Sequence, residues 1–199
     1  MKYFDFKKKL EKPLFTTQDI RLLGDKVFAY QLCLWQKQGY IIKLKNGVYV
    51  FTDGIGQVKP ETIAANLYAP SYISLEKALS FYGLIPEMVY SITSVTPKTT
   101  RTFKNRLGNF TYQHLKPALF CGYREIKDGP ASYLLAEPEK ALLDYLYLHK
   151  IKDKKDWQGL RLNQKIINNT FRPKLFANYL RLFDNKKLTA LCSKNLELK

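Results

Sequence analysis

The pattern of hydrophobic and polar positions at the start of the chain predicts a succession of short helices. In the segment 2–11, Phe4 or Phe6 falls on the same helical face as Leu10 and is expected to be buried with it. A second helix is expected after Thr16, because Asp19 lies three residues later and completes a capping box. A tight turn at Gly24 ends that helix.

A third helix is expected from Lys26 to Gln38. Phe28, Leu32 and Trp35 follow the i, i+4, i+7 spacing and are predicted to face the core. The opposite face has no acidic residue, as a recognition helix in a DNA groove requires. Tyr30 is equally compatible with packing between helices. The candidate DNA-binding residues of this helix are Lys26, Tyr30 and Lys37.

A hairpin follows, with strands at 41–44 and 48–51 joined through an Asn-Gly turn. Helix, helix, turn, helix and hairpin is the order of a winged helix-turn-helix. The hairpin residues predicted to contact the DNA backbone are Lys43, Lys45 and Asn46. Since Arg and Asn are scarce on the recognition helix, phosphates are expected to supply most of the affinity. A small α+β lobe without DNA-binding function is the alternative.

A glycine-containing stretch at 53–57 is expected to be a hinge between two domains, residues 1–55 and 56–199. The second domain is predicted to be α+β, with a small, mainly antiparallel sheet. Ser74 is expected to cap a short helix that Gly83 ends. The strands are expected at 89–96, 110–115, 119–126 and 133–135, and further helices at 60–67, 137–148, 164–168 and 173–183.

Charge adds a partner class to this picture. The 199 residues carry a net charge of +16, divided as +5 in residues 1–55, +4 in 56–135 and +7 in 136–199. Such an excess attracts polyanions, of which nucleic acid is the commonest in a cell. A lysine-rich solvated surface is the alternative. Because the excess is spread along the chain, we expect more than the N-terminal domain to face a polyanion.

The remaining composition predicts a cytoplasmic protein without cofactor or metal. The three cysteines match neither a zinc-ligand spacing nor a disulfide framework. No apolar stretch approaches the roughly 18 residues of a membrane span, and no signal peptide is expected.

Candidate catalytic residues are few, so the chain is not expected to be an enzyme. His114 and His149 are isolated, and no phosphate-binding glycine loop is present. The sequence Glu137-Pro138-Glu139-Lys140 lacks the spacing of a two-metal nuclease. Glu139 and Lys140 are instead expected to be solvated at a helix start.

The segment 97–106 is the most basic loop expected in the second domain. Its cations suit a carboxylate or phosphate partner and are Lys98, Arg101, Lys104 and Arg106. The alternative is an exposed turn between strands, with Phe103 in the core.

Three blocks carry a family resemblance: PSYISLEKALSFYGLIPE from Pro70, TSVT from Thr93 and AEPEKALLDYLYL from Ala136. In this order the chain resembles the AbiEi-family antitoxins of type IV, or abortive-infection, toxin–antitoxin pairs. The resemblance implies repression of its own operon through double-stranded promoter DNA, and neutralisation of a nucleotidyltransferase-like toxin without a stable complex. The lysine-rich N-terminal domain departs from the arginines often found there in the family.

Two other functions remain open. One is a stand-alone winged-helix transcriptional regulator with a partner-sensing lobe, and the other is a DNA-processing enzyme. A nucleotidyltransferase-like neighbouring gene would favour the antitoxin, whereas metal-dependent cleavage of DNA would favour the enzyme.

Overall fold

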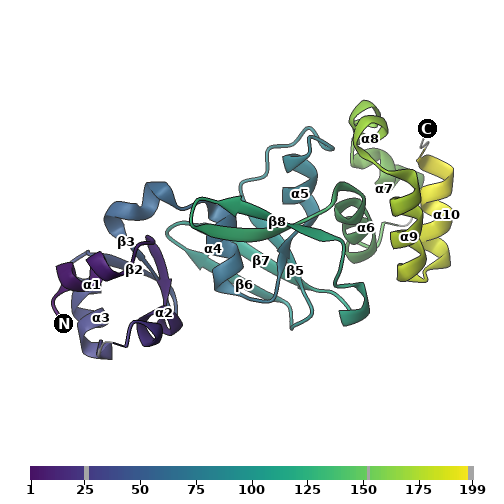
Figure 1. The fold of residues 1–199 in the computed structure, drawn as a ribbon. Helices are drawn as coiled ribbons and strands as arrows, with labels where there is room; N and C mark the ends of the chain where they lie inside the picture. Colours follow the sequence, from purple (N-terminus) through teal and green to yellow (C-terminus); the bar gives the residue numbers. More distant parts are fainter. Residues whose placement is uncertain (25–26, 152, 197–199) are drawn as a thin grey trace.

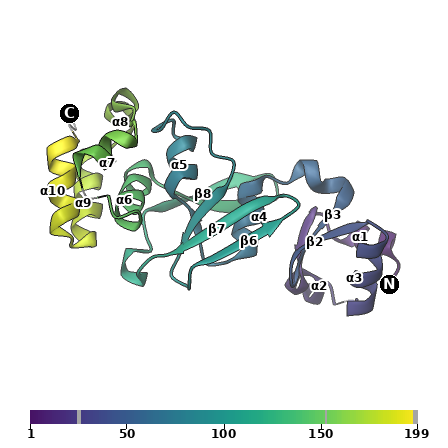
Figure 2. The same cartoon turned by 180° about the vertical axis from the view of Figure 1, so that it is seen from behind.

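The computed structural model describes residues 1–24, 27–151 and 153–196. The chain is elongated, with an N-terminal module at one end, a sheet in the middle and a group of helices at the other end (Figures 1 and 2). Among the described residues, no helix combines the length and the apolar character needed to cross a membrane.

The N-terminal module contains three helices and a three-stranded antiparallel sheet, in which β3 lies between β1 and β2. Its elements are α1 (Tyr3–Lys9), β1 (Leu14–Thr16), α2 (Thr17–Leu22), α3 (Ala29–Lys37), β2 (Ile41–Lys45) and β3 (Val48–Phe51). The predicted capping box of α2 is confirmed, because Thr16 and Asp19 exchange hydrogen bonds between side chain and backbone. The predicted hairpin is also confirmed, with Gly47 at a φ of 80° in the turn.

One predicted core position of α3 is wrong. Leu32 and Trp35 are buried, but Phe28 is 53% exposed. Phe28 precedes the first residue of the helix and has an extended backbone, so its side chain does not lie on the helical face of Leu32 and Trp35. Its ring stacks on that of Tyr30, with the ring centroids 5.9 Å apart. Gln31 is buried in the module instead, where its amide nitrogen donates a hydrogen bond to the Met1 carbonyl at 2.7 Å.

The segment expected to be a hinge forms a 3-10 helix, η1 (Thr52–Gln57). Gly54 is buried there, and a Cβ atom at this position would lie 2.6 Å from Cβ of Pro13. Apolar residues of the module, including Leu14, Val48 and Val50, belong to the same core cluster as the second domain. Apolar packing therefore joins the N-terminal module to the rest of the chain.

The second domain is built on a six-stranded sheet in the order β6-β7-β5-β4-β9-β8. Its sheet elements and the helices between them are α4 (Pro60–Leu67), β4 (Tyr72–Ile73), α5 (Leu75–Phe81), β5 (Ile92–Thr96), β6 (Arg101–Asn105), β7 (Gly108–His114), η2 (Pro117–Leu119), β8 (Tyr123–Asp128) and β9 (Ala131–Ala136). The helices that follow are α6 (Pro138–Leu148), α7 (Lys154–Gly159), α8 (Gln164–Thr170), α9 (Pro173–Phe183) and α10 (Lys186–Asn195).

The sheet is mixed, with antiparallel pairs in the majority, as predicted. Strands β4 and β9 pair in parallel, as do β5 and β7, while the other three pairs are antiparallel. The parallel pairing of β5 with β7 follows from β6, which was expected to be a loop. After β5 the chain forms β6 at the edge of the sheet and then turns back to form β7. Strand β7 lies between β6 and β5 and runs parallel to β5.

The close contact at Gly54 generates a prediction with an internal control. Gly54→Ala should lower the free energy of unfolding by about 1–3 kcal/mol, because the new methyl group collides with the Pro13 ring. Gly56→Ala, two residues along the same 3-10 helix, meets no atom within 4 Å and should stay within about 1 kcal/mol of the wild type. Urea unfolding of the full chain measures both. Equal stability of the two variants would show that the Gly54 contact does not constrain the junction.

Candidate functional site

Cations from both domains meet at the junction between the hairpin and the edge of the large sheet. The Lys45 ammonium in β2 lies 5.7 Å from the centroid of the Phe103 ring in β6. The Lys98 ammonium and the Arg101 guanidinium lie 5.6 and 5.7 Å from the Tyr68 ring. The two rings are themselves 6.0 Å apart. We call these five residues, Lys45, Tyr68, Lys98, Arg101 and Phe103, the cationic seam.

The positive charges of the seam are not neutralised within the described part of the chain. None of Lys45, Lys98 and Arg101 forms an ion pair with a described carboxylate. Burial lowers the pKa of Lys45, and the neighbouring charges of Lys98 and Arg101 lower it further. Like charges held together in this way repel one another, and a bound anion would relieve that repulsion. The seam is therefore a candidate anion-binding site.

The structure divides the four predicted partner-surface residues into separate groups. Lys98 and Arg101 belong to the seam. Side chains alternate along a strand, so Lys104 projects from the opposite face of β6 to Arg101 and Phe103. Arg106 lies in the turn that leads from β6 to β7, and all four cations are exposed.

The other predicted DNA-binding residues lie on the surface of the N-terminal module. Tyr30 and Lys37 of α3 are exposed, as are Lys43 and Asn46 of the hairpin. Lys26 lies outside the described residues. Lys37 is the only basic residue within α3.

A second cluster of polar residues is buried in the middle of the second domain. Asp144 of α6 pairs with Lys140 one turn earlier, and its other oxygen accepts hydrogen bonds from the hydroxyls of Tyr72 at 2.8 Å and Ser74 at 2.9 Å. Lys140 also donates to the Tyr72 hydroxyl at 2.9 Å. We call these four residues the buried motif cluster, because each comes from a block that carries the family resemblance.

The electrostatics of the buried motif cluster follow from its burial, since none of the four side chains is more than 1% exposed. Burial raises the pKa of Tyr72 well above its ordinary value, and the Asp144 charge adds to the shift. Burial likewise raises the pKa of Asp144, whereas the Lys140 ammonium and the two hydroxyl donors oppose that shift. The predicted capping role of Ser74 is wrong, because its hydroxyl donates to Asp144 and makes no capping bond to α5.

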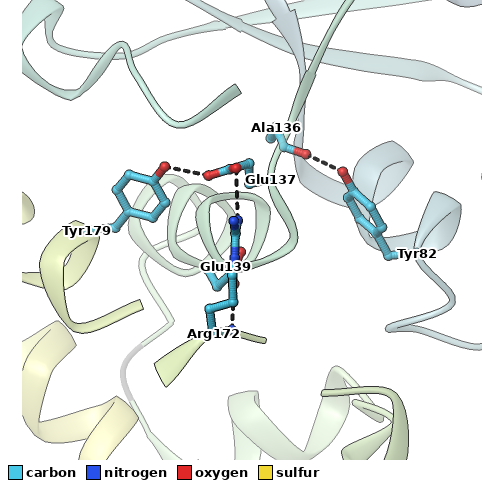
Figure 3. Close-up of polar contacts among 6 residues, drawn as sticks. All are labelled: Tyr82, Ala136, Glu137, Glu139, Arg172 and Tyr179. Carbon is cyan, nitrogen blue, oxygen red and sulfur yellow. Dashed lines mark hydrogen bonds and ion pairs between the residues drawn. The ribbon is translucent and has the colours of Figure 1, made fainter. Parts of the chain in front are cut away.

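The start of α6 is tied to α9 by a neighbouring set of contacts (Figure 3). Glu137 accepts hydrogen bonds from Arg172 at 2.8 Å and from the Tyr179 hydroxyl at 2.5 Å. Although burial alone would raise the pKa of Glu137, these donors lower it overall. The backbone N–H of Arg172 donates to Glu139 at 2.7 Å.

The expectation that Glu139 and Lys140 are solvated is therefore wrong. Both side chains are buried. Arg172, at the start of α9, covers Glu139, whereas Lys140 lies against Tyr72 and the Phe183 ring. The buried motif cluster has no exposed reacting group in this conformation, and its contacts instead hold strand β4, helix α5 and helix α6 together.

Metal-binding and histidine chemistry have little support in the geometry. Across the described ranges, no three His, Cys, Asp or Glu side chains come together in a way that could hold a metal ion. His149, which is isolated in the sequence, lies 3.0 Å from the Glu76 carboxylate, and that contact raises the pKa of the imidazole.

Comparison with known proteins gives no assignment. The chain matches no protein-family model, and no curated protein is significantly similar to it. The cationic seam and the buried motif cluster are therefore the features of this chain that bear on its function.

The buried ion pair generates a stability prediction. Asp144→Ala should lower the free energy of unfolding by about 3–5 kcal/mol, because it leaves the Lys140 ammonium buried without a counter-charge. Replacing both partners in Lys140→Met/Asp144→Leu should cost less than Asp144→Ala alone, since no buried charge remains. Urea unfolding of the two variants and the wild type measures the difference. A loss below about 1 kcal/mol in Asp144→Ala would contradict the proposed role of this pair.

Proposed function

We propose that this protein is a DNA-binding repressor and the antitoxin of a type IV toxin–antitoxin pair. The observation that carries the DNA-binding part is the cationic seam, where the hairpin of the N-terminal module and the edge of the large sheet present unneutralised cations side by side. Double-stranded DNA is the proposed ligand, because its backbone is a continuous row of phosphates.

The order of elements in the N-terminal module supports a winged helix-turn-helix. Helix, strand, two helices and a hairpin follow one another, and the first strand completes the sheet of the hairpin. In such a domain the helix before the hairpin enters the major groove, and the hairpin forms the wing. Here α3 would enter the groove with Tyr30 and Lys37 outward, while Lys43 and Asn46 contact the backbone.

The seam would extend the contact of the wing along the DNA backbone. Arg101 and Lys98 lie beside Lys45, so a phosphate bound by the wing is also within the field of the second domain. Because α3 offers few side chains for bidentate base recognition, phosphate contacts would provide most of the affinity. Repression of its own operon from promoter DNA is the regulatory role that we propose.

The antitoxin part of the proposal depends on the family resemblance. Two of the three resembling blocks supply the buried motif cluster, so the resemblance concerns residues that determine the fold of the second domain. A shared fold supports a shared role, namely neutralising a nucleotidyltransferase-like toxin in the cytoplasm without a stable complex. A nucleotidyltransferase-like neighbouring gene separates this role from that of a stand-alone regulator.

The seam generates a prediction for DNA binding. Lys98→Gln/Arg101→Gln should weaken binding to the promoter duplex of its own gene and lower the slope of log affinity against log salt by about 2, one unit for each lost phosphate contact. Lys104→Gln, on the same strand but the opposite face, should leave the slope unchanged. Fluorescence anisotropy at several salt concentrations measures both variants.

Circular dichroism of the same samples confirms that the variants are folded. A salt slope near zero for the wild type would contradict DNA binding altogether. An unchanged slope in Lys98→Gln/Arg101→Gln would instead remove the second domain from the DNA contact.

A further inference from the structure

A groove of about 830 Å³ lies at the end of the chain remote from the N-terminal module, between the C-terminal end of α6, the residues that follow it and α10. Figures 1 and 2 show α10 as the outermost helix at that end. The apolar lining includes Leu146, Leu188 and Leu191, which are buried, and Ile151, which is half-buried. None of these residues belongs to the seam or to the buried motif cluster.

The rim of the groove is strongly basic. Among the described residues, four exposed lysines line it, Lys150, Lys154, Lys187 and Lys194, against a single acid, Asp153. The Asp153 carboxylate is already used to cap α7, where it accepts a hydrogen bond from the backbone of Asp156 at 2.8 Å. None of the four lysines forms an ion pair with a carboxylate in the part of the chain that the structure describes.

We infer that this groove binds an acidic amphipathic helix of a protein partner. Leucine-like side chains spaced i, i+3, i+4 and i+7 on one face of a helix would fill the apolar floor. Carboxylates beside that face would meet the four lysines of the rim, so the charge complementarity selects an acidic segment over a basic one. An apolar floor is poorly suited to nucleic acid, which has no aliphatic side chains with which to fill it.

The inference does not depend on the proposed function. The groove lies beside α10, at the end of the molecule remote from the N-terminal module, whereas the seam lies where that module meets the sheet, so a partner bound to α10 leaves the hairpin and β6 accessible to DNA (Figures 1 and 2). The chemistry of the partner is specified by the groove alone.

The test uses two fluorescein-labelled synthetic helical peptides of about 14 residues, or four turns. Both carry leucines at the i, i+3, i+4 and i+7 positions, and the other positions are Glu-rich in one peptide and Lys-rich in the other. The full-length protein should bind the acidic peptide at least about tenfold more tightly than the basic peptide, with an affinity that falls as salt rises. Comparable binding of the two peptides, or binding of neither, overturns the inference.

Variants of the full chain locate the binding site. Lys154→Glu/Lys187→Glu should weaken the acidic peptide at least about tenfold. The matched control Lys155→Glu/Lys186→Glu makes the same change of charge on the same two helices at residues that do not line the groove, and should weaken it no more than about threefold. Ala190→Trp, which fills the groove without a change of charge, should also weaken binding.

The outcomes separate this site from the DNA site. Groove variants that lose the peptide but keep the wild-type affinity for duplex DNA support a dedicated protein-binding groove. An equal effect of the control and groove variants overturns the inference, because charge alone then explains binding. Displacement of the acidic peptide by duplex DNA, together with loss of DNA binding in the groove variants, overturns it in favour of a nucleic-acid surface. Circular dichroism confirms the folding of every variant.

Discussion

The ion pair between Lys140 and Asp144 is shielded from water, and the architecture of the second domain depends on it. Neither charge is tolerable there alone, because an unpaired buried ion costs several kcal/mol. Asp144 also accepts hydrogen bonds from Tyr72 of β4 and from Ser74 at the start of α5. A sheet strand and two helices are thereby held in one relative position.

Helix α6, which carries this ion pair, also contacts the C-terminal helices. Glu137 and Glu139, which directly precede Lys140 of the buried motif cluster, bind Arg172 at the start of α9. Leu75, directly after Ser74, has a φ of 58°, an uncommon conformation for a residue with a side chain, and it is fully buried. The core therefore imposes this backbone conformation, as expected where Ser74 must reach Asp144. The C-terminal end of α6 itself lines the groove beside α10.

Local signals in the sequence predicted local structure well. The capping box at Thr16, the Asn-Gly turn of the hairpin and the helices expected at 60–67, 137–148 and 173–183 are all confirmed. Each of these features depends on residues within a few positions of one another.

Features that depend on distant partners were not predictable in the same way. Strand β6 is polar and basic, and only its pairing with β7 makes it a strand. Glu139 is buried beneath Arg172, about thirty residues later in the chain, and Lys140 is buried against Tyr72 and Phe183, which are equally distant in sequence or more so. The seam likewise brings Lys45 to Arg101 across two domains, so the sequence identified both cations as candidate ligands without indicating that they are neighbours.

The central functional claim is that the hairpin and strand β6 form one DNA-facing surface. Hydrogen–deuterium exchange of the full chain with and without its promoter duplex tests this claim most directly. We predict slower exchange in the hairpin at 41–51 and in β6 when DNA is bound, with α10 unchanged. Protection of the hairpin alone, with exchange in β6 unaffected, would contradict it.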